Sequence, residues 1–144
     1  MIDLKEILKK VELFDGLTDA ELDEMAKICQ EKRIHRREVI AKQGEPGNNF
    51  FIVTEGFVEV LLEEPRRVVV NLGPGQLIGE MAVVDQGPRS ATVEAVTEPT
   101  VVQAISRTDF EALCERNTHI GYVVVRNIAA DLSFKLRHRH LSER

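Results

Sequence analysis

Residues 77–93 decide the fold of this chain, and they read LIGEMAVVDQGPRSATV. The segment places a glycine, a carboxylate, an arginine and a hydroxyl between two apolar runs. Glu80 opens what we expect to be a single helical turn over 81–84, which ends at Asp85-Gln86-Gly87-Pro88. The first N–H groups of such a turn have no intrahelical partner, and Arg89 then supplies a planar, permanently charged fork. The pattern predicts a pocket for a small phosphorylated ligand that also offers hydroxyls to Glu80.

The same segment resembles a known family. Gly79-Glu80 and Pro88-Arg89-Ser90-Ala91-Thr92 are similar to the phosphate-binding cassette of cyclic nucleotide-binding domains. These domains occur in catabolite activator proteins, protein kinase regulatory subunits and cyclic nucleotide-gated channels. The resemblance extends from about Leu13 to about Leu136, most of the chain. Its other parts follow the family's order: the N-terminal helix junction, the first β-roll turns and the start of the first C-terminal helix, at 13–18, 43–47, 55–60 and 109–113.

The resemblance implies which residues hold the ligand. Arg89 would pair with the cyclic phosphate, Ser90 would add a hydroxyl donor and Ala91 a backbone N–H. Glu80 would accept a hydrogen bond from the ribose hydroxyl. A buried phosphodiester carries a negative charge that has to be paired or strongly hydrogen-bonded, which agrees with this assignment. The predicted ligand-binding residues are Gly79, Glu80, Met81, Ala82, Arg89, Ser90, Ala91, Lys135 and Leu136.

The residues that face the base follow from the resemblance alone. In this family residues of the last helix cover the purine, in activator-type members with hydroxyl side chains. Here those positions hold Lys135 and Leu136. Either apolar contact and Lys135 hold the base, or the helix is set differently. Ser90 does not decide the base, because a hydroxyl after the arginine can also reach the guanine amino group. We expect cyclic AMP rather than cyclic GMP.

The composition is that of one globular domain. The chain has 144 residues, with 43% hydrophobic and 30% charged residues, which suits a single core. No segment approaches the roughly 18 apolar residues that cross a bilayer, and the acidic amino terminus lacks a secretory pattern. We therefore expect a cytoplasmic protein without membrane contact. The net charge of −5 argues against a nucleic-acid partner, and the basic run Lys135–His140 is more typical of a cationic last helical turn than of a nucleic-acid patch.

Helical patterns stand at both ends of the chain, with strand patterns between them. Asp3–Val11 is typical of a short amphipathic helix, and Thr18–Glu21 forms a capping box for a second. Short β-type runs with glycine turns follow, at 39–41, 50–53, 57–60, 68–70, 91–95 and 101–102. The sequence predicts a single α+β (mainly β) domain over 1–144: a jelly-roll or double-stranded β-helix at about 32–105, with N-terminal helices at about 3–31 and C-terminal helices at about 106–140.

The last helix, from His119 to about His140, carries an apolar stripe. Its members recur at spacings of three and four: Val125, Ile128, Leu132 and Leu136. The stripe can pack on the chain's own β-roll or, as in activator-like relatives, pair with a second copy of the helix. It is short for a coiled coil, which usually needs three or more heptads. A homodimer through this helix is therefore one of two interpretations.

A binding module is the leading functional hypothesis: a cyclic nucleotide sensor whose C-terminal helix changes position on ligand binding. Its output would be dimerisation or a separate effector protein. The alternatives are a ligand-independent scaffold domain and the effector-binding fragment of a transcription regulator without its helix-turn-helix domain. A metal enzyme of the cupin type needs several converging histidines, and the β region contains only His35. No Cys–His or Ser–His pair has a plausible frame for nucleophilic catalysis. We therefore predict no catalytic residue, no metal site and no cofactor.

Overall fold

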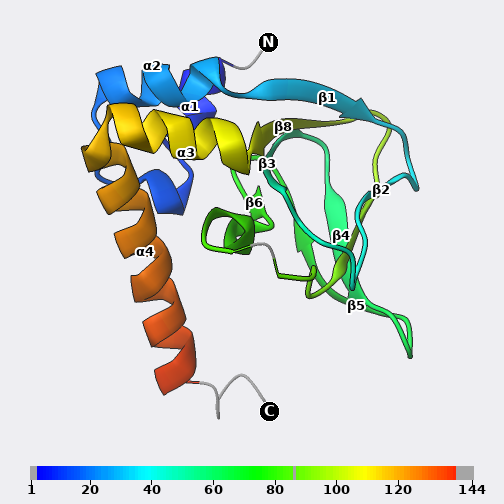
Figure 1. Cartoon of the computed structure of the whole chain (residues 1–144). Helices are drawn as coiled ribbons and strands as arrows, with labels where there is room; N and C mark the ends of the chain where they lie inside the picture. The colour runs from blue at the N-terminus through cyan, green and yellow to red at the C-terminus, as the bar shows by residue number, and fades with distance from the viewer. Residues whose placement is uncertain (1–2, 86, 139–144) are drawn as a thin grey trace.

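Two four-stranded sheets and two groups of helices make up the computed structural model, which describes residues 3–85 and 87–138. The strand orders are β1-β8-β3-β6 and β2-β7-β4-β5. The sheets form a β-roll, and the helices gather beside it, with α4 extending away along one side (Figure 1). The fold is α+β, as predicted: a two-sheet β-roll with N-terminal helices and a long C-terminal helix.

The elements follow one another along the chain in a simple order. The N-terminal helices are α1 (Leu4–Leu8), η1 (Glu12–Phe14) and α2 (Asp19–Lys27). The strands are β1 (Gln30–Ile34), β2 (Val39–Ala41), β3 (Asn49–Glu55), β4 (Val58–Leu62), β5 (Arg67–Leu72), β6 (Leu77–Ile78), β7 (Thr92–Ala95) and β8 (Thr100–Ser106). The 3-10 turn η2 (Glu80–Val83) lies between β6 and β7, and α3 (Arg107–Arg116) and α4 (Thr118–Arg137) complete the chain.

The capping box at the start of α2 is confirmed. The hydroxyl of Thr18 accepts a hydrogen bond of 3.2 Å from the Glu21 N–H, and the Glu21 carboxylate accepts one of 3.0 Å from the Thr18 N–H. The first helix is shorter than expected, because α1 ends at Leu8. Val11 has extended backbone angles and caps η1, so a continuous helix over Asp3–Val11 was wrong.

The β-roll begins slightly earlier than the predicted boundary at about residue 32. We expected helix to about residue 31, yet β1 begins at Gln30. Only Ile34 of this strand is buried, so its sequence carries no alternation of apolar and polar residues. The strand forms because its backbone pairs with β8, from Gln30 opposite Ala104 to Ile34 opposite Thr100. Tertiary pairing thus decides the structure of a polar segment that local pattern does not mark.

Strand β3 separates the two hydrophobic cores. Successive side chains of a strand point to opposite faces. Phe50 and Ile52 therefore pack into the helical core with residues of the N-terminal helices, α3 and α4, whereas Phe51 and Val53 pack inside the roll. This explains why β3 is a continuous apolar run. The arrangement fixes the helical layer against one sheet.

Helix α4 has an anchored inner half and an exposed outer half. Ile120, Val124 and Ile128 are buried in the helical core. Val125, Leu132 and Leu136 are 48%, 37% and 68% exposed. The predicted stripe was therefore wrong in one member, since Ile128 faces the chain's own core while its other members do not. Helix α4 ends at Arg137, and the predicted end near His140 lies outside the described residues. Gln86, in the predicted end of the helical turn that follows Glu80, also lies outside them.

Membrane-spanning character is absent from the described helices. None of the helices within residues 3–85 and 87–138 combines the length and the apolar character that a bilayer crossing requires.

Candidate functional site

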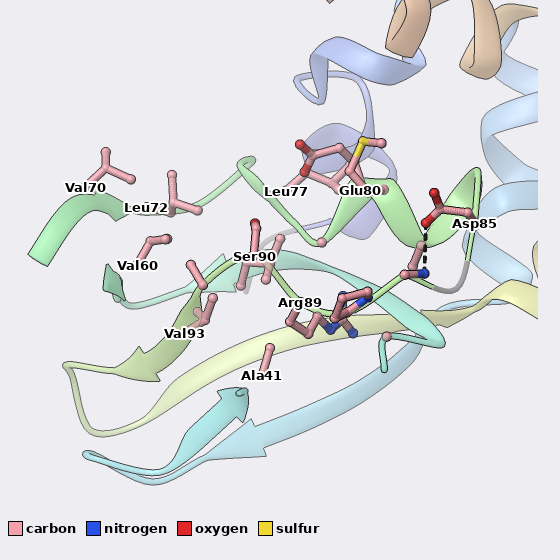
Figure 2. Close-up of a pocket in the computed structure, with 18 of the residues that line it drawn as sticks. Ala41, Val60, Val70, Leu72, Leu77, Glu80, Asp85, Arg89, Ser90 and Val93 are labelled. Carbon is pink, nitrogen blue, oxygen red and sulfur yellow. Dashed lines mark hydrogen bonds between the residues drawn. The ribbon is translucent and has the colours of Figure 1, made fainter. Parts of the chain in front are cut away.

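A hollow of about 430 Å³ lies against the inner face of the second sheet (Figure 2). Its apolar wall is one row across four neighbouring strands, because Val93 pairs with both Ala41 and Val60, and Val60 pairs with Val70. Leu72, Leu77 and Ile78 extend this wall. The volume lies within the range of small-molecule sites.

The polar wall comes from η2 and from the loop that leads to β7. Gly79 precedes η2 and adopts φ +75°, where an L side chain is strained. A Cβ atom at Gly79 would also collide with the guanidinium of Arg89. Glycine is therefore required both for the turn and for the position of the arginine. The expected helical turn over 81–84 is present one residue earlier, at Glu80–Val83.

The loop before β7 fixes Arg89 through its backbone. The Arg89 N–H donates to the carbonyl of Glu45 at 2.8 Å, and the Arg89 carbonyl accepts from the N–H of Gly44 at 2.9 Å. The Arg89 side chain donates through Nη2 to the carbonyl of Asn49 at 2.6 Å. Its guanidinium carbon lies 5.8 Å from the centroid of the Phe51 ring. The turn after β2 and the start of β3 thus hold the arginine in the hollow.

The guanidinium of Arg89 is a half-buried cation. Burial lowers the pKa of Arg89 from its usual value, because desolvation disfavours the charged form. No ion pair among residues 3–85 and 87–138 includes this arginine. A partly desolvated cation with free donors is suited to an anion that supplies the missing charge.

Glu80 lines the same hollow from η2. Figure 2 shows Glu80 and Arg89 on different walls, with Val60, Val70 and Leu72 at the far end. Among residues 3–85 and 87–138, the Glu80 carboxylate takes part in no side-chain hydrogen bond and in no ion pair. An ionised carboxylate accepts hydrogen bonds only. The site therefore combines an anion-binding group with a strong acceptor for a hydroxyl.

Comparison with known proteins identifies this arrangement. Residues 31–117 match the family described as "Cyclic nucleotide-binding domain". The chain belongs to this family. The match contains every strand from β2 to β8 and all of α3, together with η2 and the Arg89 loop. The polar wall of the hollow therefore lies within the part of the chain that matches a cyclic nucleotide-binding domain.

Relatives of this cyclic nucleotide-binding domain include channels and regulators. It is 36% identical over 118 residues to a cyclic nucleotide-gated potassium channel of Mesorhizobium japonicum, covering 82% of this chain and 32% of the channel. It is 35% identical over 137 residues to the cyclic AMP receptor protein of Thermus thermophilus, covering 93% of this chain and 61% of that protein. The chain thus spans less than two thirds of these relatives.

Solved structures share the fold. The Thermus thermophilus catabolite activator protein superposes with a TM-score of 0.79 at 34% identity, covering 91% of this chain and 61% of that one. The N-terminal domain of a transcriptional regulator from Streptomyces coelicolor superposes with a TM-score of 0.84 at 26% identity, covering 92% and 94% of the two chains.

Most of the predicted ligand-binding residues line the cyclic nucleotide-binding domain's hollow. These are Gly79, Glu80, Met81, Ala82, Arg89, Ser90, Ala91 and Lys135. Leu136 does not line the hollow in this structure and is 68% exposed. Their roles toward a ligand stay predictions.

Sequence reasoning missed the apolar wall of the hollow. The row from Ala41 to Val70 was placed in strands but not in the site. Alternation within β4 and β7 marks these residues as one face of a sheet, yet it does not say that the face lines a pocket. Only strand order and register bring the row together.

Proposed function

We propose that this domain binds a 3′,5′-cyclic nucleotide, and cyclic AMP in preference to cyclic GMP, as a regulatory module without catalytic activity. The observation that carries the proposal is Arg89. This half-buried cation has no carboxylate partner among the described residues, and it shares its hollow with the unengaged Glu80. That the protein is located in the cytoplasm stays a prediction from the sequence.

The chemistry of a cyclic nucleotide fits the two polar groups. The cyclic phosphate carries one negative charge, which the fork of Arg89 can bind through parallel hydrogen bonds. Both the 3′ and the 5′ oxygens are esterified, so the 2′-hydroxyl is the free hydroxyl of the ribose. Glu80 accepts a hydrogen bond from it, and Ser90 and the Ala91 backbone add donors to the phosphate. Linear monophosphates carry more charge and a different shape, so they bind more weakly.

The apolar wall supports the preference for adenine. Val60, Val70 and Leu72 offer no hydrogen-bond partner to a base. Guanine has more polar groups than adenine to remove from water, and each one left unpaired costs free energy. We place Lys135 or Leu136 of α4 over the base, which requires the outer half of α4 to approach the hollow.

Helix α4 is built to move at its outer end. Asn127 donates hydrogen bonds of 2.9 Å to the carbonyls of Leu13 and Asp15 and so fixes the inner half to the N-terminal helices. Beyond Ile128, the residues up to Arg137 are mostly exposed. A ligand shifts a conformation only through contacts that differ between two states. The outer half of α4 supplies such contacts, because it is not packed into either core.

A homodimer through α4 is part of the proposal. Tyr122, Val125, Ala129 and Leu132 are exposed and recur at spacings of three and four. This is the spacing of a coiled-coil seam, here about two heptads long. Binding of a separate effector protein is the other route for the signal. The net charge of −5 argues against nucleic acid as a partner of this domain.

Isothermal titration tests the proposal directly. Cyclic AMP should bind one site per chain, with cyclic GMP weaker and linear AMP weaker still. Ligand that binds only the folded state raises the free energy of unfolding, by about 2.7 kcal/mol at a concentration about 100 times Kd. Absence of both heat and thermal stabilisation with either cyclic nucleotide would exclude the function and favour a ligand-independent scaffold.

A further inference from the structure

A second hollow, of about 540 Å³, adjoins the nucleotide pocket. It lies between η1, the turn from β5 to β6 and α4, and Lys10, Asn127 and Asp131 belong to its wall. Four residues line both hollows: Leu72, Leu77, Glu80 and Lys135. Two of these are apolar, so the shared wall carries one carboxylate and one ammonium group.

Lys135 connects α4 with this shared wall. Within the part of α4 that the structure describes, it is the one residue that lines the nucleotide pocket. Its ammonium group forms an ion pair of 2.9 Å with Asp131, one turn earlier on the same helix. The hydrogen bond to Asp131, together with the charges of Asp131 and Glu80, raises the pKa of Lys135. The ammonium thus stands in the field of two carboxylates, one on its own helix and one in the pocket.

We propose that Lys135 is a positioning residue for Glu80, and that it does not contact the base. The proposal rests on the proposed function and assigns one of the two α4 residues discussed above. A carboxylate has about four acceptor positions, so Glu80 can bind the lysine ammonium and the ribose 2′-hydroxyl together. Glu80 and Lys135 both line the nucleotide pocket and the adjoining hollow, so the carboxylate is open to the lysine as well as to a ligand in the pocket.

The chemistry of the lysine supports this assignment. An ammonium group only donates hydrogen bonds. Adenine offers it neutral ring nitrogens such as N7, next to an amino group that is itself a donor, whereas Glu80 offers a charged carboxylate. A hydrogen bond between two charged groups is the stronger one, so Lys135 has a better partner in Glu80 than in the base. The pair with Asp131 is exposed and spaced i, i+4, a class that contributes little stability. The lysine can therefore turn from Asp131 to Glu80 at low cost.

The consequence is a link between the ribose and the last helix. Glu80 belongs to η2 on the roll, and Lys135 belongs to the outer half of α4. Ligand that orders Glu80 would hold the lysine and with it the end of α4. Leu136 is then the residue of α4 that would contact the base.

The test compares Lys135→Met with Lys135→Arg by titration with cyclic AMP, cyclic GMP and 2′-deoxy cyclic AMP. Lys135→Met should weaken cyclic AMP and cyclic GMP by the same factor, about two- to five-fold, the range of exposed ion pairs. It should leave the affinity for 2′-deoxy cyclic AMP unchanged, because that ligand does not engage Glu80. Lys135→Arg should retain the affinity, and Lys135→Met should have no further effect in a Glu80→Gln background.

Asp131→Asn is the matched control, since it removes the other partner of Lys135. It should leave cyclic AMP affinity unchanged or tighter. A loss equal to that of Lys135→Met would assign the effect to the ion pair within α4 and overturn the inference. An equal loss with the 2′-deoxy ligand, or unequal losses for the two bases, would assign Lys135 to the base instead.

The failure of this inference can be told from the failure of the proposed function. If the unaltered chain binds cyclic nucleotide and Lys135→Met binds every ligand equally well, the inference alone is wrong. If the unaltered chain binds none of the three ligands, the proposed function is wrong and the inference fails with it.

Discussion

The guanidinium of Arg89 lies against the backbone of Asn49, whose carbonyl oxygen accepts a hydrogen bond of 2.6 Å from Nη2. Asn49 is the first residue of β3, so the arginine is held by the roll without a ligand. Among the described residues this is the side-chain hydrogen bond that Arg89 makes, which leaves its other N–H donors for an anion. A group that is already in place loses less conformational entropy on binding.

Arg89→Ala is expected to remove most of the affinity for cyclic AMP. The phosphate charge would be left unpaired in a partly desolvated site, which costs roughly 3–5 kcal/mol for a buried pair. The ligand-free variant should unfold at a temperature close to that of the parent, because removal of a half-buried cation is offset by loss of its hydrogen bond to the Asn49 carbonyl. Titration and thermal unfolding measure the two effects. Binding as tight as that of the parent would show that the phosphate lies elsewhere.

Glu80→Gln is expected to cost less than Arg89→Ala. The amide keeps the shape but loses the charge, and a hydrogen bond to a charged group contributes roughly 1.5–3 kcal/mol. Titration with 2′-deoxy cyclic AMP supplies the control, because both parent and variant lack the ribose contact with that ligand. If the variant loses affinity for the 2′-deoxy ligand to the same extent, Glu80 does not bind the 2′-hydroxyl.

Local chemistry made the cassette readable from sequence. Gly79, Glu80 and Arg89 lie within one short segment. The glycine indicates a turn, the glutamate a hydrogen-bond acceptor, and the arginine a group that binds an anion. The structure brings Glu80 and Arg89 to one hollow. The capping box at Thr18 was readable for the same reason, since both of its hydrogen bonds join neighbouring residues.

Features that depend on distant pairing were not readable. Strand β1 is polar and is defined by its partner β8. The apolar wall of the hollow forms only when β2, β7, β4 and β5 pair in the observed register, which the sequence does not give. On α4, Val125 and Ile128 are alike in composition and spacing, yet one is 48% exposed and the other 2%. Periodicity finds an apolar side of a helix, but the width of the contact with the core decides which residues it buries.

The capping box should make stability depend on pH at the acid end. Burial alone would raise the pKa of Glu21, but hydrogen bonds from the Thr18 N–H and His119 and the charge of His119 outweigh it, so this pKa lies below its usual value of 4.5. A carboxylate with a lowered pKa stabilises the fold above its unfolded pKa, and this contribution is lost as the pH falls through the folded value. Stability should therefore fall below about pH 4.5.

Glu21→Gln isolates this contribution. At pH 7 the variant should melt at a lower temperature than the parent, because a neutral amide accepts weaker hydrogen bonds than the carboxylate does from the Thr18 N–H at 3.0 Å and from His119 Nδ1 at 2.8 Å. The difference should shrink as the pH falls below 4.5, where the parent carboxylate also becomes neutral. Thermal unfolding followed by circular dichroism over pH 3–7 measures it. A difference that stays constant across this range would contradict the assignment.

Neighbouring apolar residues of α4 should differ in their roles. Ile128→Ala empties a site in the helical core and should lower the free energy of unfolding by about 2–5 kcal/mol. Val125→Ala should change it by at most about 0.5 kcal/mol in the monomer, because the side chain is half exposed. Denaturant unfolding measures the loss of stability in Ile128→Ala.

Sedimentation should show a weaker dimer for Val125→Ala than for the parent. A dimer of unchanged strength would show that the interface does not include Val125.

The outer half of α4 should become ordered when ligand binds. The inner half is held by Asn127 and by buried residues such as Ile128, so it has little freedom to respond. Hydrogen exchange should therefore slow in two places, the cassette at 79–90 and the segment 132–136. The inner part of α4 should be protected equally with and without cyclic AMP, which makes it an internal control.

Truncation before Leu132 gives the second measurement. The removed residues lie beyond those that α4 buries in the helical core, so the roll and the remaining helices should stay folded. Affinity for cyclic AMP should fall, because the contacts of Lys135 and Leu136 are gone. If protection rises only in the cassette, and the truncated chain binds unchanged, α4 does not close over the base. The domain would then receive the nucleotide without passing a change to its last helix.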